Sequence, residues 1–126
     1  MAKKLVTPGI KKLIEANALS FSTVDNRGNP HNIAVAYVRV FDDYIVITNV
    51  HIKESIENLK NNPNVSLVVW NKDWEAVCVG FEIKGAAENQ TSGIYFDFVK
   101  NMPDNEGFDV KSAIVVHVNK IKKLES

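Results

Sequence analysis

Apolar and polar residues alternate along most of the chain, which is the pattern of strands that bury one face in a core. The alternation predicts strands at residues 18–24, 31–41, 44–48, 65–70, 76–87 and 112–121. Short segments rich in Asp, Asn and Gly separate several of these strands and have the composition of turns. Six strands joined in this way favour a mainly β fold, an antiparallel sheet that curls into a barrel because closure removes unpaired edges.

The expected strand at residues 31–41 is apolar on both of its faces. One face carries Ile33, Val35 and Tyr37, and the other carries Ala34, Ala36, Val38 and Val40. One face fits the barrel interior, and the other needs a ligand or a second subunit as its partner. Cys78, in the strand expected at 76–87, lies in an apolar run and is interpreted as buried packing.

Apolar residues at helical spacing predict three helices between the strands. The first begins at Thr7, with Pro8 in its first turn, and ends near Asn17. The second runs from about residue 52 to the residues before Pro63, and the third covers residues 95–102. The polar, glycine-bearing segment at 103–109 is expected to be a mobile loop.

The turn from the strand at 44–48 into the second helix is the first candidate site. A strand that runs into a helix points the free N–H groups and the positive dipole end of that helix at whatever lies above the strand. Lys53 and Ser55 add a cation and a hydroxyl there, and together these groups fit a phosphate. A solvated lysine and an ordinary first-turn serine fit the same residues, so both interpretations stay open.

Composition narrows the classes of protein that the chain can belong to. The 126 residues predict one domain, 1–126, and the 15 basic and 15 acidic side chains cancel, which argues against a nucleic-acid partner. One cysteine excludes an intrachain disulfide and fits a reducing, cytoplasmic setting. No apolar region follows the basic start at residues 1–5, and no run reaches membrane-spanning length, so neither a signal peptide nor a membrane segment is expected.

Other candidate chemistry is weak. His31, His51 and His117 lie far apart in the chain without a neighbouring cysteine or glutamate at ligand spacing, so no metal site is expected. The chain has no GxGxxG, Walker or GxSxG motif, and no catalytic residue can be named. Trp70 and Trp74 flank a polar loop; they fit core packing, a dimer contact or a wall against a flat aromatic ligand.

Several segments, taken in order, resemble one known family. They are 19–25 with 28–31, 32–40, 48–49 leading to 57–63, 65–70 and 80–87. In order and spacing these segments resemble the pyridoxamine 5'-phosphate oxidase-like, FMN-binding split barrels, especially the small single-domain FMN-binding proteins. The resemblance implies a six-stranded antiparallel Greek-key split barrel that forms a homodimer and binds one FMN per subunit at the interface.

The resemblance also implies which residues hold the cofactor. The residues expected against the isoalloxazine are Ile33, Ala34, Val35 and Ala36, and those expected along the ring and ribityl chain are Ile47, Thr48 and Asn49. Lys53 and Ser55 match the phosphate-binding positions at the start of the following helix. Glu54 departs from the pattern of the family, because it separates Lys53 from Ser55. Many relatives place the basic residue directly before the hydroxyl or lysine.

The implied function is an FMN-dependent oxidoreductase or electron carrier. Flavin accepts hydride or electrons without an acid–base pair from the protein, which supplies binding and orientation, so the lack of a catalytic constellation fits this function. The Arg-containing C-terminal segment that recognises pyridoxamine phosphate in the true oxidases has no counterpart up to Ser126, so pyridoxamine oxidation is not expected. The alternatives are a deazaflavin- or haem-related split barrel and a cofactor-free ligand-binding or structural dimer.

Overall fold

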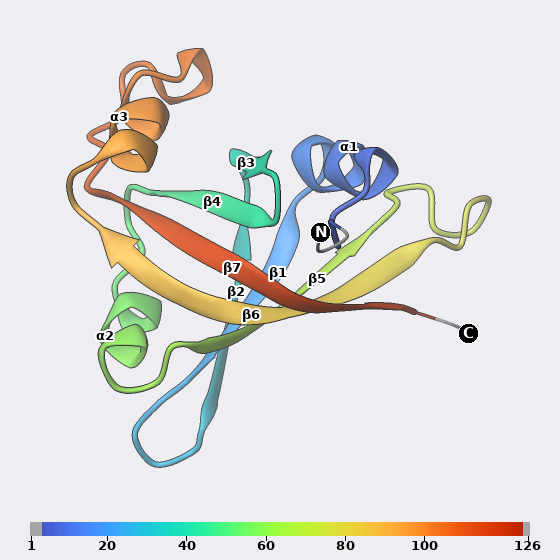
Figure 1. Ribbon diagram of the computed structural model, residues 1–126, viewed down its shortest axis with the longest axis horizontal. Coiled ribbons are helices and arrows are strands. Elements are labelled where there is room, and N and C mark those ends of the chain that lie inside the picture. The colour runs from blue at the N-terminus through green and yellow to red at the C-terminus, as the bar shows by residue number, and fades with distance from the viewer. Residues whose placement is uncertain (1–3, 125–126) are drawn as a thin grey trace.

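A computed structural model describes residues 4–124, so the first three residues of the basic N-terminal start lie outside the described part. The described chain forms one antiparallel sheet with the strand order β2-β1-β5-β6-β7-β4-β3. The strands are β1 Leu19–Val24, β2 Pro30–Val35, β3 Val38–Phe41, β4 Tyr44–Asn49, β5 Asn64–Trp70, β6 Gly80–Gln90 and β7 Ser112–Lys123. The sheet curls so that β6 and β7 cross in front of β1, β2 and β5 (Figure 1).

Three α-helices, α1 Pro8–Ala16, α2 Glu54–Asn61 and α3 Ile94–Lys100, lie around the curled sheet, and a 3₁₀ turn, η1 Pro103–Asn105, follows α3. Helix α1 packs against β3 and β5, α2 against β1 and β6, and α3 against β4 and β7 (Figure 1). The expected start of α1 is confirmed: the Ile10 N–H donates to Thr7 Oγ1 at 3.3 Å, and Pro8 occupies the first turn.

The fold is a split barrel, and its opening lies where a single strand was predicted. Residues 31–41 form two strands, β2 and β3, which are the opposite edges of the sheet and are joined by Ala36 and Tyr37. The prediction of one strand is wrong because β2 pairs with β1 while β3 pairs with β4, at the far end of the sheet order. Tyr37 makes the turn between them with a φ of 56°, a left-handed conformation that is uncommon for tyrosine.

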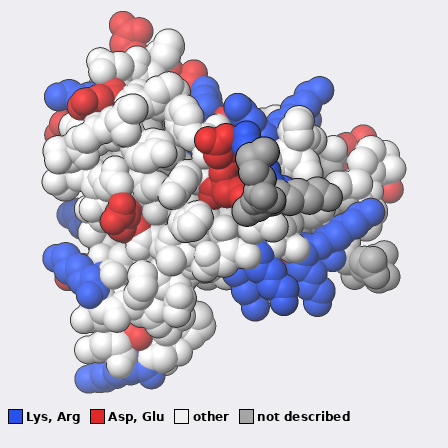
Figure 2. All heavy atoms as spheres, viewed as in Figure 1, with Lys and Arg blue, Asp and Glu red and all other residues white. Residues whose placement is uncertain are grey.

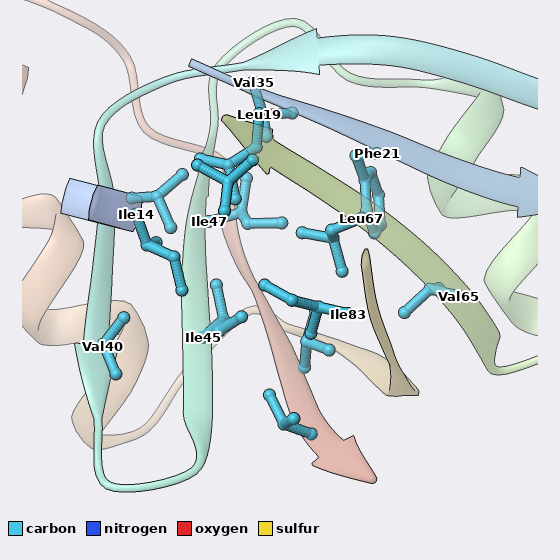
Figure 3. Packing of buried hydrophobic residues seen from close by; sticks show 14 of the residues in the cluster. Ile14, Leu19, Phe21, Val35, Val40, Ile45, Ile47, Val65, Leu67 and Ile83 are labelled. Carbon is cyan, nitrogen blue, oxygen red and sulfur yellow. The ribbon is translucent and has the colours of Figure 1, made fainter. Parts of the chain in front are cut away.

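The barrel interior is filled by apolar side chains from nearly every strand. In Figure 3 these side chains point toward one another: Ile14, Leu19, Phe21, Val35, Val40, Ile45, Ile47, Val65, Leu67 and Ile83. A second apolar cluster packs the segment after β6 against β4 and β7; its members are Val46, Val99, Met102, Val110, Ala113 and Val115. Strand β4 is therefore buried on both faces from Ile45 to Asn49.

The predicted start of the fifth strand at residue 76 is wrong, and so is the burial of Cys78. Strand β6 begins at Gly80, and Cys78 is exposed in the loop before it. The loop turns back on itself through a 2.7 Å hydrogen bond from Val77 N to Asp73 O. The chain joins the sheet only at Gly80, which packs so closely on β5 that a Cβ there would lie 3.1 Å from Val69 O. The apolar residues before Gly80 therefore do not mark the start of the strand.

Acidic and basic side chains are interspersed over the face in Figure 2, apart from a basic group at its lower right, where the start of β6 lies beside the end of β7. The exposed lysines of these two strands are Lys84, Lys120, Lys122 and Lys123. Between residues 4 and 124, no helix has the length and apolar character needed to cross a membrane.

Candidate functional site

A cleft of about 260 Å³ lies at the barrel opening. Its walls come from the end of β2 and the turn after it, from the end of β4 with the residues that follow, and from η1 with the residues after it. The lining residues are Ala34, Val35, Ala36, Tyr37, Thr48, Val50, His51, Ile52, Asn105 and Phe108. The lining is mostly apolar with a few polar groups, which is the ordinary construction of a small-molecule site.

A buried hydrogen-bond network joins the three walls of this cleft. Thr48 Oγ1 donates to the carbonyl oxygen of Tyr37 at 3.2 Å and accepts from Asn105 Nδ2 at 3.1 Å. The same Asn105 Nδ2 donates to the carbonyl oxygen of Val99 at 2.8 Å. Asn105 Oδ1 is buried and has no partner. The network fixes the left-handed turn at Tyr37 to α3 and leaves one amide oxygen free beside the cleft.

The residues that follow β4 lead from the cleft wall directly into α2. Asn49 shapes this connection, because its Oδ1 accepts from Ile52 N at 2.7 Å and its Nδ2 donates to Ser112 Oγ at 2.8 Å. Lys53 is the N-cap residue of α2, and no side chain caps the helix, so the first-turn N–H groups have no side-chain partner. Ser55, in that first turn, is fully buried, and its Oγ has no hydrogen-bond partner.

Glu54 also lies in the first turn of α2, and its carboxylate contacts His31 on β2. Glu54 Oε2 lies against His31 Nδ1, an ion pair when the imidazole is protonated. This contact engages the carboxylate with β2, while Lys53 is exposed and forms no ion pair among the described residues. An anion at the N-terminus of α2 therefore meets free N–H groups, one lysine and one serine, with the nearest carboxylate already in contact with a potential cation.

The structure places the predicted site residues in five different surroundings. Ala34, Val35, Ala36 and Thr48 line the cleft, and Lys53 and Ser55 lie at the start of α2. Ile33 lines a neighbouring groove that also includes Ala34 and Trp70. Ile47 is fully buried in the barrel core, and Asn49 is buried in the turn that it shapes. The residues predicted from the sequence therefore lie at the ends of β2 and β4 and at the start of α2, but only some of them line the cleft.

The sequence analysis missed the wall contributed by the segment at 103–109. The expectation of a mobile loop is wrong at Asn105, which is 2% exposed, and Phe108 lines the cleft. The available signal was Phe108 itself, an aromatic residue in a stretch that is otherwise polar and glycine-bearing. Tyr37 and His51 also line the cleft and were not predicted. Tyr37 lies in a turn that the sequence pattern predicts as the middle of a strand.

A larger groove, of about 700 Å³, lies between α1 and the loop before β6. Its walls include Ile10, Leu13, Val77 and Phe81, but neither of the two buried unpartnered side-chain atoms among the described residues. No group of three or more His, Cys, Asp or Glu side chains between residues 4 and 124 is arranged to hold a metal ion. The cleft and the start of α2 are therefore the candidate site.

Comparisons with known proteins agree with this fold. HupZ of Group A Streptococcus is 24% identical, with a TM-score of 0.86 over 97% of this chain and 96% of that one. An FMN-binding protein from Syntrophomonas wolfei is also 24% identical, with a TM-score of 0.79 over 92% of this chain and 84% of the Syntrophomonas chain. HutZ, a haem storage protein of Vibrio cholerae, is 18% identical, with a TM-score of 0.68 over 93% of both chains. At these identities the likeness shows a shared fold.

The sequence itself also matches a family. No curated protein matches the chain. The family model for pyridoxamine 5'-phosphate oxidase matches residues 6–124, nearly the whole sequence, and this extent agrees with the split barrel and with the order of the segments that resemble the family. The chain therefore belongs to the pyridoxamine 5'-phosphate oxidase family.

Proposed function

We propose that the protein binds FMN in the cleft at the barrel opening and acts as a small flavin-dependent redox protein. The observation that carries the proposal is the buried, unpartnered hydroxyl of Ser55 at the uncapped start of α2, directly after the cleft wall formed by residues 50–52. A ligand that suits this arrangement has a flat apolar part for the cleft and an anionic group for the helix. FMN has both.

The start of α2 suits a phosphate on three grounds. Its first-turn N–H groups have no side-chain cap, the Lys53 ammonium is free to approach, and Ser55 Oγ can donate once an acceptor is present. A buried hydroxyl without a partner costs about 1–3 kcal/mol, so a bound phosphate oxygen would recover free energy that the empty site loses. The Glu54 carboxylate contacts His31, and its repulsion of a phosphate is smaller when that imidazole is protonated.

The cleft suits a flat ring system. Ala34 and Ala36 are exposed and small, so a ring can approach the backbone of β2 closely, while Tyr37 and Phe108 are half-exposed aromatic side chains at the rim. A cleft of about 260 Å³ falls below the range of about 300–1,000 Å³ that is usual for ligand pockets. The small volume supports a site of which one subunit supplies only a part.

We propose that a second copy of the chain completes the site. Trp70 and Trp74 are 42% and 39% exposed, and they line a groove with Val68 and Leu124. Trp70 also lines the groove that contains Ala34, a residue of the cleft wall, so the apolar surface continues from the cleft to the tryptophans. A homodimer over this surface would bury both tryptophans and place partner residues beside the ring.

FMN, when bound, supplies the transfer of hydride or electrons. The chain supplies positioning: β2 and the aromatic rim hold the ring and exclude water, and the start of α2 holds the phosphate. Thr48 keeps the Tyr37 carbonyl group in place through its hydrogen bond. No side chain of the described cleft has to transfer a proton for this function.

FMN titration followed by flavin fluorescence tests the proposal. We expect the wild-type protein to bind FMN, and Lys53→Ala or Ser55→Ala to weaken binding about tenfold each, the value of a hydrogen bond to a charged group. Lys60→Ala is the matched control, because Lys60 lies at the other end of α2 and pairs with Glu57. Failure of the wild-type protein to bind FMN would refute the proposal.

Light scattering after size-exclusion chromatography tests the homodimer. Trp70→Ser should yield monomers and reduce FMN affinity, because it removes apolar area from the interface and loosens the second wall. Ile94→Ser is the control, since Ile94 is 78% exposed on α3, outside the cleft and the Trp70 grooves. A wild-type protein that is monomeric with FMN bound would contradict the role of the second copy.

Haem is the second candidate ligand, and one observation favours it. His51 is an exposed imidazole on the cleft wall, and a histidine is the common axial ligand of haem iron. Titration with hemin separates the two candidates: a sharp Soret band that is lost in His51→Ala supports haem. FMN binding that survives His51→Ala supports the flavin.

A further inference from the structure

The amide of Asn105 has one orientation that its surroundings permit. Both of its Nδ2 hydrogens are used, one toward the Val99 carbonyl oxygen and one toward Thr48 Oγ1. Thr48 in turn donates its own hydrogen to the Tyr37 carbonyl oxygen, so it has none to give to Asn105. Rotating the amide by 180° would place Oδ1 against the Val99 oxygen, two acceptors facing each other. Asn105 Oδ1 is thus the free acceptor of this network.

A free acceptor in this position is costly without a ligand. Buried side-chain oxygens nearly always have a hydrogen-bond partner, and leaving one without a partner costs about 1–3 kcal/mol. Asn105 is 2% exposed, so bulk water does not satisfy Oδ1, and no described protein group donates to it. Asn105 lines the cleft together with Tyr37, Thr48 and His51, and none of their side chains donates to Oδ1. A donor on a molecule bound in the cleft would supply the missing hydrogen.

We infer that Asn105 Oδ1 accepts a hydrogen bond from the imide N–H of the flavin ring and thereby selects the pyrimidine end of the cofactor. This inference rests on the proposed binding of FMN. The oxidised isoalloxazine carries one N–H, between its two carbonyl groups, and its other ring heteroatoms are acceptors. Metal-bound porphyrin carries no N–H at all. An unpaired acceptor in the wall therefore favours a flavin-type ring over haem by its hydrogen-bond chemistry alone.

Asn105 serves the site in two ways. Its Nδ2 holds Thr48 and, through Thr48, the left-handed turn at Tyr37, while its Oδ1 is the group offered to the ligand. The ligand-binding end of the side chain is therefore held rigid from behind before any ligand arrives. Such preorganisation reduces the ordering cost of binding.

The decisive experiment compares FMN with its N3-methyl analogue, in which a methyl group replaces the imide hydrogen. We expect the wild-type protein to bind the analogue at least about tenfold more weakly than FMN, because the acceptor loses its donor. Asn105→Leu should weaken FMN binding by a similar factor. Its affinities for FMN and for the N3-methyl analogue should then be nearly equal. Asn101→Leu is the matched control on the same segment and should behave like the wild type.

Each outcome decides the inference. Equal affinity of the wild-type protein for both flavins overturns it, and this measurement needs no variant, so it stands even if Asn105→Leu does not fold. The same loss for the analogue in wild type and in Asn105→Leu also overturns it, since the imide hydrogen then bonds elsewhere. If the wild-type protein binds neither flavin, the proposed function itself fails, and that result differs from both of the others.

Discussion

The two sides of the barrel differ in how completely their strands are paired and their buried polar atoms are hydrogen-bonded. On the closed side, β6 and β7 pair from Phe81–Lys123 to Gln90–Ala113 around one bulge at Lys84 and Gly85, and most of their interior side chains are buried. On the open side, β2 and β3 are short edge strands, their connection at Tyr37 is left-handed, and a buried amide oxygen lacks a partner. On the closed side the strands pair with each other along their length, while on the open side the buried Asn105 Oδ1 has no hydrogen-bond partner.

This difference indicates where stability and binding reside. A side chain removed from the closed side should change the free energy of unfolding and leave the cleft alone. A side chain removed from the open side should change ligand affinity and cost little stability, because strain and unpaired groups collect at functional sites. Four measurements test this separation, beginning with the largest expected effect.

Ile83→Ala should destabilise the protein by about 2–5 kcal/mol, since Ile83 is fully buried in the barrel core and the truncation leaves a cavity. Ile94→Ala removes the same atoms from a residue that is 78% exposed and should cost less than about 0.5 kcal/mol. Urea unfolding followed by tryptophan fluorescence measures both. Equal losses in the two variants would show that the barrel core does not dominate stability.

Gly85→Ala should cost about 1–3 kcal/mol, because the new Cβ would lie 2.4 Å from the His117 carbonyl oxygen and the two strands would have to separate. Gly9→Ala is the control: nothing lies within 4 Å of a Cβ there, and alanine favours the helix by up to about 1 kcal/mol. Thermal unfolding should show opposite signs for the two variants. Two melting temperatures that shift together would contradict the close packing at the bulge.

Tyr37→Gly should leave stability nearly unchanged, because the relief of a left-handed tyrosine, about 1 kcal/mol, offsets the added chain entropy of glycine, about 0.5–1 kcal/mol. FMN affinity should fall about two- to tenfold with the loss of an aromatic wall. Asp42→Gly relieves a similar φ of 53° in the β3–β4 turn, away from the cleft, and should leave affinity unchanged. Equal FMN dissociation constants in both variants would remove Tyr37 from the site.

Asp25→Asn should have the smallest effect, and the effect should depend on pH. Backbone N–H groups of Asn29 and Arg27 donate to the Asp25 carboxylate and lower its pKa. A lowered folded-state pKa stabilises the protein above the ordinary value of 3.8, and this contribution is lost as the pH falls through the folded value. The wild-type advantage in melting temperature should therefore shrink as the pH drops below 3.8. An advantage that grows on acidification would contradict the sign.

The sequence predicted the features of the fold that depend on local chemistry. The start of α1 follows from Thr7 and Pro8, and most strand positions follow from alternation. The break at Ala36 and Tyr37 was not predictable, because no glycine or proline marks it and it arises from pairing at two distant edges of the sheet. The Cys78 loop was not predictable for a related reason. Its apolar residues have the pattern of a strand, but β6 begins only at Gly80, where it pairs with Trp70 of β5.

The candidate site was predictable to a similar extent. Residues next to each other in sequence, such as Ala34 to Ala36 or Lys53 and Ser55, were found because a strand end or a helix start identifies them. Asn105 could not be found in this way. Its importance depends on Thr48, which is 57 positions away in the chain, and on a missing partner, which only the packed structure reveals.

The place of β7 in the sheet has a consequence for how the protein is made. Among the described strands β7 is synthesised after the other six, yet it lies between β6 and β4 in the sheet. Among the described strands, the β3–β4 hairpin reaches the rest of the sheet only through β7, from Tyr44–His117 to Asn49–Ser112. Until residues 112–123 leave the ribosome, that hairpin has an open edge and the barrel has no interior. A nascent chain arrested before residue 112 is therefore expected to keep this edge unpaired and to bind chaperones.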